Sequence, residues 1–265
     1  MESRSSKVRI PVENISSKSA FNENCGFQPR RSPRFNGAAL KEENVAKPEP
    51  PPVLSAIHFK GSINYANTFG DCAMACDDLL QQIKKTADPI VPIGFDLEWP
   101  FSWKTGSGKT ALAQICMDYK ICHLLHIYEL KALPAAFVEL LSHPKVKLVG
   151  VNIKNDVWKL GRDFKDFPAQ KVVENNCFDC GKFANETLNR SCRWSMANLT
   201  AYLLRKEISK DPKVRQSKWH IQPLSDEQKS YAATDAYVSL LLHNTIQDKA
   251  NEIAIQKQNE NNCTE

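Results

Sequence analysis

The sequence predicts one α/β domain that follows an unstructured N-terminal tail. Three patterns indicate this fold class: strand-like alternation in residues 91–99, two further apolar strands within residues 111–127, and a helix with a clear start at residues 225–247. A chain of 265 residues is long enough for one good-sized domain and a tail. We therefore expect the domain to span residues 54–250 and the last residues, 251–265, to fray.

The tail, residues 1–53, is expected to be disordered because it is rich in Ser, Asn, Pro and charge and has few periodic apolar positions. Its segment PRRSPR, residues 29–34, is either a nuclear-import signal, a phosphorylation site or a merely solvated basic stretch. The first residues, MESRSSKVRI, lack the apolar region of a secretory signal, and no run is long and apolar enough for a membrane span. We expect a soluble, intracellular protein that does not enter a membrane.

Charge and cysteine content further limit the kinds of function and binding site to be expected. The net charge of +5 at pH 7 permits nucleic-acid binding without demonstrating it. Nine cysteines, an odd number, are expected to be mostly free thiols in such a protein. The pair Cys177 and Cys180 forms a lone C-x-x-C with Cys192 as a third candidate ligand, but a structural zinc site needs four ligands at defined spacing, so none is expected.

The elements of the domain are expected in a fixed order. They are a helix at residues 71–85, strands at 91–99, 111–117 and 121–127, a helix at 133–141, a strand at 147–151, a helix from about 153, and helices at 194–204 and 225–247. Ser225 and Gln228 form a capping box at the start of the last helix. The acidic pair Asp226 and Glu227 favours the positive end of its dipole.

The segment WKTGSGKT, residues 103–110, looks like a phosphate-binding loop. Its last three residues fit the pattern G-x-x-x-x-G-K-[ST], but Trp103 stands where the first glycine is needed. A bulky tryptophan resists the positive φ of that tight turn. The segment that follows, residues 111–117, is interpreted as a strand, although a helix is not excluded, whereas a P-loop requires a helix there. A nucleotide hydrolase is therefore the weakest alternative, and a loop between two strands is preferred.

Two carboxylates lie on one face of the strand at residues 91–99. Because strand side chains alternate, Asp96 and Glu98 point the same way, about 6.6 Å apart along the strand. Two like charges between apolar neighbours need a positive partner, and the strand carries no Lys or Arg. Hard oxygen ligands suit Mg²⁺ or Mn²⁺. The alternative is an edge strand on which both carboxylates face solvent.

Two further acids follow along the chain. Asp235 lies one helical turn after Tyr231, on or beside a stripe that should face the core, although a surface aspartate is the alternative. Asp156 lies where a short strand runs into a helix, so it either joins the other acids or serves as an ordinary helix-start residue. Trp158 either belongs to the core or stacks on a base.

The three acidic motifs resemble those of the DEDD 3′–5′ exonucleases. FDLEWP (residues 95–100), VGVNIKNDVWKL (149–160) and YAATDAY (231–237) stand in the order of that family's motifs. The tyrosine four residues before the last aspartate resembles the tyrosine subclass, and Ser230 stands where the histidine subclass carries its histidine.

The closer resemblance is to Werner-syndrome-type exonuclease domains. The segment SKWHIQPLSDEQKSYAATDAY, residues 217–237, and the frame FDLEWPF…TG.GK.AL.QIC look like that subfamily, and the likeness covers about residues 56–248. The chain has no room for a helicase, so it resembles the stand-alone members.

The resemblance implies a ribonuclease-H-like fold, a mixed sheet of five or six strands flanked by helices. It implies two Mg²⁺ or Mn²⁺ ions held by Asp96, Glu98, Asp156 and Asp235, with Tyr231 as the catalytic tyrosine. Tyr231 would orient or deprotonate the attacking water, and orientation is favoured because a phenol with its ordinary pKa of about 10 is a weak base. The implied activity removes nucleoside 5′-monophosphates from the 3′ ends of DNA, as single strands or as duplexes with overhangs or recessed ends. A nuclear location, a role in replication and repair, and protein partners from those processes are implied by the family alone.

A basic run before the last helix is a candidate path for the nucleic-acid backbone. The residues proposed to contact nucleic acid are Lys213, Arg215 and Lys218 from this run, together with Leu97 and Trp158. A solvated loop is the alternative. Two other functions remain open: a ribonuclease-D-like exoribonuclease acting on RNA, and an inactive DEDD nucleic-acid-binding module. The second is disfavoured because none of the four acids is lost.

Overall fold

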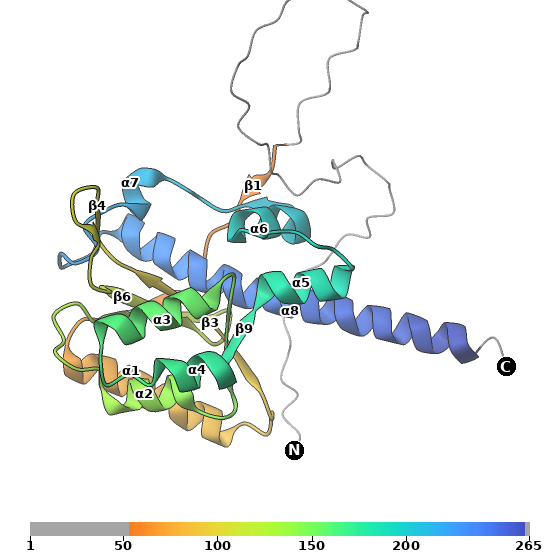
Figure 1. The fold of residues 1–265 in the computed structure, drawn as a ribbon, viewed down its shortest axis with the longest axis horizontal. Helices are drawn as coiled ribbons and strands as arrows, with labels where there is room; N and C mark the ends of the chain where they lie inside the picture. The colour runs from red at the N-terminus through yellow and green to blue at the C-terminus, as the bar shows by residue number, and fades with distance from the viewer. Residues whose placement is uncertain (1–52, 263–265) are drawn as a thin grey trace, which may run out of the picture. The chain divides into compact units, whose positions relative to one another are not determined.

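The computed structural model describes residues 53–262, and the predicted tail up to residue 52, with its PRRSPR segment, lies outside this range. The described chain forms a six-stranded mixed sheet with helices on both faces (Figure 1). This arrangement confirms the predicted α/β class and the ribonuclease-H-like expectation. The proposed limits of the domain remain a prediction.

The central sheet has the strand order β2-β7-β6-β3-β8-β9. β6 runs antiparallel to both of its neighbours, and the other neighbouring pairs are parallel. Its strands are β2 (Ser62–Ala66), β3 (Val91–Glu98), β6 (Leu112–Cys116), β7 (Ile121–His126), β8 (Val146–Gly150) and β9 (Cys177–Asp179). Two small pairs complete the strands: β1 (Ser55–Ala56) with β10 (Lys206–Glu207), and β4 (Phe101–Ser102) with β5 (Gly106–Ser107).

Eight helices surround the sheet in the described range. They are α1 (Phe69–Lys85), α2 (Ala135–Ser142), α3 (Ile153–Asp163), α4 (Ala169–Asn175), α5 (Cys180–Leu188), α6 (Met196–Leu204), α7 (Pro212–Arg215) and α8 (Asp226–Asn262). The long predicted elements are confirmed, and their ends differ by a few residues except at the end of α8. The strands β2 and β9 and the short helices α4, α5 and α7 were not predicted from the sequence. No helix within residues 53–262 is long and apolar enough to cross a membrane.

The hydrophobic core lies between one face of the sheet and the helices α1 to α4. Ile93, Phe95 and Leu97 are the inward residues of β3 on this face, and all three are buried. The alternate residues of β3 face α8 on the opposite side. The alternation of one central strand therefore separates an apolar face from a face that carries acids.

Gly94 lets α8 cross β3 at close range. A Cβ atom at position 94 would lie 2.0 Å from the carbonyl oxygen of Ala236 and 3.0 Å from the backbone nitrogen of Leu240. Any larger residue would therefore push the helix away from the strand. The small buried residues Ala232 and Ala233 extend this tight contact along α8. The close crossing brings the acid of α8 to the acids of β3.

The start of α8 confirms the predicted capping box. The backbone N–H of Ser225 donates to Gln228 Oε1 at 2.9 Å, and the backbone N–H of Gln228 donates to Ser225 Oγ at 3.2 Å. The predicted end is wrong, because α8 does not stop near Gln247 but continues to Asn262. Figure 1 shows it, in blue, extending past the sheet. In the described part, helix therefore replaces the frayed end expected from residue 251.

The loop that resembles a P-loop is used for structural contacts. Lys109 Nζ donates to the carbonyl oxygens of Tyr128 and Leu130, at 2.7 Å each. Thr110 donates through its backbone N–H and its Oγ1 to the Asp163 carboxylate, again at 2.7 Å each. The strand β6 follows, as predicted, where a P-loop needs a helix. The groups that would hold a phosphate are therefore already bound within the protein.

Candidate active site

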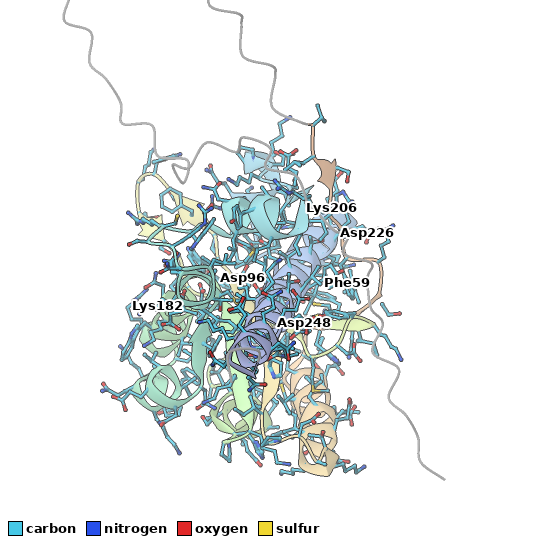
Figure 2. All side chains as sticks on the ribbon, turned by 90° about the vertical axis from the view of Figure 1, so that its right-hand side faces the viewer. Phe59, Asp96, Lys182, Lys206, Asp226 and Asp248 are labelled. Carbon is cyan, nitrogen blue, oxygen red and sulfur yellow. The ribbon has the colours of Figure 1, made fainter. Side chains whose placement is uncertain are left out.

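Three carboxylates converge where α8 crosses β3. One oxygen each from Asp96, Glu98 and Asp235 lies within 4.8 Å of the others. Asp96 lies beside α8 within the fold (Figure 2), and the side chains of Glu98 and Asp235 are buried. The alternatives of an edge strand and of a surface aspartate on the last helix are therefore wrong, since β3 is a central strand.

The local sequence explains this convergence. Asp96 and Glu98 are separated by one residue on β3 and therefore share a face. On α8, Tyr231 and Asp235 are four residues apart and lie one above the other. Gly94 fixes the distance between the two elements, as described above.

Asp156 lies near the three carboxylates without joining the group that meets the 4.8 Å criterion. It lies in the first turn of α3, which follows β8 after Asn152 in a left-handed conformation. Burial raises the pKa of Asp156 well above its ordinary range, and the negative charge of Asp96 raises it further. The two carboxylates thus interact electrostatically.

Burial and mutual repulsion raise the pKa of every acid in the cluster. Burial raises the pKa of Asp96 to about 7, opposed by a hydrogen bond from the Leu97 backbone and by the charge of Arg215. Burial also raises the pKa of Glu98, as do the charges of Asp96 and Asp235. Without a compensating positive charge, the folded protein therefore favours the protonated acids.

The donor set fits a hard divalent cation. It consists of carboxylate oxygens alone, which Mg²⁺ and Mn²⁺ prefer. No salt bridge within residues 53–262 reaches any of the four acids, so the nearest compensation is the through-space charge of Arg215. A bound cation would remove the repulsion that raises these pKa values. The number and identity of the ions follow from the family resemblance alone.

Tyr231 is placed to donate a hydrogen bond into the cluster. Its hydroxyl hydrogen-bonds the Asp235 carboxylate. Burial raises the pKa of Tyr231, and the charges of Asp235 and Glu98 raise it further. The phenol therefore stays protonated at neutral pH, which favours an orienting role over that of a general base.

Trp219 connects Tyr231 to the basic segment before α8. Its fully buried ring packs 6.1 Å from the Tyr231 ring, centroid to centroid, and its Nε1 donates to the carbonyl oxygen of Arg215 at 3.1 Å. His126 further fixes this tryptophan through a 2.9 Å hydrogen bond between its Nε2 and the Trp219 carbonyl oxygen. Trp219 could not be identified from the sequence, because a tryptophan in a polar segment does not indicate which residues it contacts.

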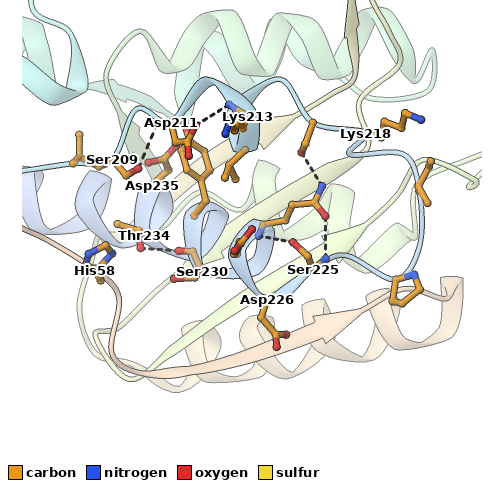
Figure 3. Close-up of a pocket in the computed structure, with 18 residues that line it drawn as sticks. His58, Ser209, Asp211, Lys213, Lys218, Ser225, Asp226, Ser230, Thr234 and Asp235 are labelled. Carbon is orange, nitrogen blue, oxygen red and sulfur yellow. Dashed lines mark hydrogen bonds between the residues drawn. The ribbon is translucent and has the colours of Figure 1, made fainter.

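An open groove of about 1170 Å³ leads to Asp235 and Tyr231. Figure 3 shows Lys213 and Lys218 along it, both from the predicted basic run. Arg215 is exposed, does not line the groove, and lowers the pKa values of Asp96 and Asp235. Nucleic-acid contacts by these three residues remain a prediction, for which the groove offers a route.

Two predicted nucleic-acid contacts have different outcomes. Leu97 is 3% exposed and belongs to the core on the face of β3 opposite Asp96 and Glu98. The prediction that its side chain packs against a nucleotide is therefore wrong, because alternation turns it away. Trp158 is 39% exposed on α3, so it is not a core residue and stays available for stacking.

Gln114 is a neighbour of the cluster that the sequence did not reveal. It pairs with Asp96 across the β3–β6 ladder and is fully buried on the same face. Neither its amide oxygen nor its amide nitrogen has a hydrogen-bond partner in the structure. The register between β3 and β6, which depends on the connection between the two strands, brings it beside Asp96.

Comparison with known proteins identifies the family. A family model described as 3′–5′ exonuclease matches residues 71–251. A Drosophila melanogaster protein named 3′–5′ exonuclease is 41% identical over 235 residues, which cover 87% of this chain and 66% of that protein. The chain therefore spans about two thirds of the length of this relative.

Solved structures share the fold at low sequence identity. The Aedes aegypti Nibbler EXO domain matches with a TM-score of 0.61 and 16% identity, over 75% of this chain and 94% of that one. Escherichia coli RNase D matches with a TM-score of 0.56 and 16% identity, over 72% of this chain and 46% of that one. The family match spans all four predicted acids, so this chain belongs to the DEDD 3′–5′ exonuclease family.

Proposed function

We propose that this protein is a metal-dependent exonuclease that removes nucleoside 5′-monophosphates from the 3′ ends of DNA. The observation that carries the proposal is the buried cluster of Asp96, Glu98 and Asp235 at the end of an open groove with lysines along it. Burying three unpaired carboxylates in one site destabilises the folded state unless they bind cations. An intact set of acids also argues against the inactive binding module.

The residues have separate roles in this proposal. Asp96, Glu98 and Asp235 hold the divalent ions, two in number as in the family, and Asp156 adds a ligand from α3. When bound, such ions neutralise the phosphate and make water a better nucleophile near neutral pH. Tyr231, protonated and anchored on Asp235, orients the attacking water by donating a hydrogen bond. We infer from this role that the chain belongs to the tyrosine subclass.

DNA is the proposed substrate because the motif frame resembles Werner-syndrome-type domains. The second candidate is RNA, favoured by neighbours of the RNase D type. The E. coli neighbour is described as an exoribonuclease involved in structured RNA processing, and the Trypanosoma brucei RNase D was solved with RNA U12. A nuclear location and a role in replication or repair extend the DNA proposal.

The substrate class is tested with matched DNA and RNA strands of one sequence. Each strand carries a 5′ label and is supplied single-stranded, with a 3′ overhang, or with a recessed 3′ end, in Mg²⁺ or Mn²⁺. The proposal predicts stepwise ladders with a higher kcat/KM on DNA. A ladder on RNA alone establishes the exoribonuclease instead. Tight binding with no ladder on any substrate favours the inactive module.

A further inference from the structure

An exposed pair of aromatic rings lies on the hairpin that joins β3 to β6. Residues 101–107 form this hairpin, here called the aromatic hairpin. Trp103 is 86% exposed and Phe101 is 42% exposed. Their ring centroids lie 5.1 Å apart with an interplanar angle of 87°. Large apolar rings held together in water, outside any core, indicate a surface that binds something.

The base of the aromatic hairpin is firmly fixed to the domain. The backbone N–H of Gly108 donates to the Pro100 carbonyl oxygen at 2.8 Å. Lys159 Nζ, from α3, donates to the Gly108 carbonyl oxygen at 2.6 Å and lies 5.2 Å from the centre of the Trp99 ring. Trp103 is therefore presented from a support that is anchored at its base.

The aromatic hairpin begins close to the catalytic acids. Only Trp99 and Pro100 separate it from Glu98, and the backbone N–H of Ala111 donates to the Glu98 carbonyl oxygen at 2.8 Å where the chain returns. Figure 1 shows β4 and α7 at the same end of the sheet. α7 carries Lys213 and Arg215. The exposed rings thus stand at the end of the fold that holds both the acids and the basic residues.

We propose that Trp103 stacks on an unpaired base of the substrate strand, outside the acidic cluster. The inference rests on the proposed exonuclease function. A flat aromatic surface beside basic side chains matches a nucleic acid, which offers bases for stacking and phosphates for the charges. Lys104, exposed next to Trp103, adds a positive charge on the hairpin itself. Stacking accepts any base, as a degradative exonuclease requires.

The proposal predicts a specific loss of affinity. Stacking on one base contributes about 10- to 100-fold to binding of a single strand. Trp103→Ala is expected to weaken binding by this factor, whereas Trp103→Tyr, which keeps an aromatic face, retains most of it. The matched control is Met74→Ala, which removes another exposed apolar side chain, 68% exposed, from α1, which lies at the bottom of Figure 1 while β4 lies near the top.

The experiment measures binding without turnover. The full chain carrying Asp96→Asn is titrated into a fluorescein-labelled single-stranded DNA 12-mer, and into the same sequence as RNA, in buffer without divalent ions. A second series replaces each nucleotide in turn with an abasic one. The protein with Trp103 intact is expected to bind more weakly when one or two particular positions are abasic. The Trp103→Ala protein is expected to lose no further affinity when those positions are abasic.

The outcomes separate this inference from the proposed function. Equal affinity of the Trp103→Ala and Met74→Ala proteins overturns the stacking proposal while leaving the nuclease intact. A second outcome is that affinity falls at the abasic positions and with Trp103→Ala, while the wild-type protein degrades no substrate. This outcome supports stacking and refutes the proposed nuclease activity. A third outcome is that Trp103→Ala and every abasic substitution lower the binding affinity additively. This outcome refutes contact between Trp103 and a base and indicates that the two rings bind another partner, such as a protein.

Discussion

Replacing Asp96 with asparagine is expected to stabilise the ion-free protein at pH 8. Burial raises the pKa of this carboxyl from its ordinary 3.8 to about 7. The folded state then holds the proton more tightly than the unfolded state. Stability is therefore highest below about pH 4 for this group and falls as the pH rises to about 7.

The size of the effect follows from the same values. Each pKa unit corresponds to about 1.4 kcal/mol, so ionising Asp96 costs the folded state about 4 kcal/mol above pH 7. Asn has nearly the same shape and no charge, so Asp96→Asn removes this cost. The variant is expected to gain up to about 4 kcal/mol at pH 8 and little at pH 4.

Urea denaturation in EDTA at pH 4 and pH 8 measures this prediction. Asp248→Asn is the matched control, because Asp248 is an exposed acid of the same helix that carries Asp235. Adding Mg²⁺ at pH 8 should raise the urea midpoint of the wild type and leave Asp96→Asn nearly unchanged. The reasoning is refuted if Asp96→Asn and Asp248→Asn change stability equally at both pH values.

Three other changes test the geometry of the site. Gly94→Val places a side chain where a Cβ would already lie 2.0 Å from the Ala236 carbonyl oxygen, so it should cost about 1–3 kcal/mol in urea denaturation and weaken Mg²⁺ binding; unchanged values would contradict the close crossing. Gln114→Leu removes a buried amide without partners, so it should raise stability in EDTA by about 1–3 kcal/mol; a loss would mean that the amide is satisfied. Tyr231→Phe removes the hydrogen bond to Asp235, so kcat should fall about 10- to 100-fold with KM little changed, and an unchanged kcat would exclude the orienting role.

Periodic patterns explain what could be predicted of the fold. The alternation of β3 and the spacing of α8 placed Asp96, Glu98 and Asp235 on facing surfaces, because period and face are local properties of a strand and a helix. The capping box at Ser225 was equally local. The site could be predicted because its acids lie on long, regular elements.

Features set by partners distant in sequence could not be predicted. α7 has four residues and β9 has three, too few for a period to emerge. Strand register determines that Gln114 lies opposite Asp96. The position of α7 determines whether the charge of Arg215 affects the pKa values of the acids. The extension of α8 to Asn262 was not predicted, because the sequence of its last turns is polar and resembles that of a disordered tail.

Leu97 illustrates a different kind of error. The alternation that placed Asp96 and Glu98 together also turns Leu97 to the other face of β3, so a nucleotide contact was inconsistent with the pattern already used. Leu97 lies between the two acids in the sequence, but sequence proximity on a strand does not give a shared face.

The most direct test of the central claim is the release of mononucleotides by the acidic cluster. A single-stranded DNA labelled on its last internal phosphate is incubated with the full chain in Mg²⁺, in EDTA, and with the Asp235→Asn and Asp248→Asn proteins. The account predicts labelled nucleoside 5′-monophosphate from the wild type and Asp248→Asn in Mg²⁺, and none in EDTA or from Asp235→Asn. Release of the same product by Asp235→Asn, or in EDTA, would contradict it.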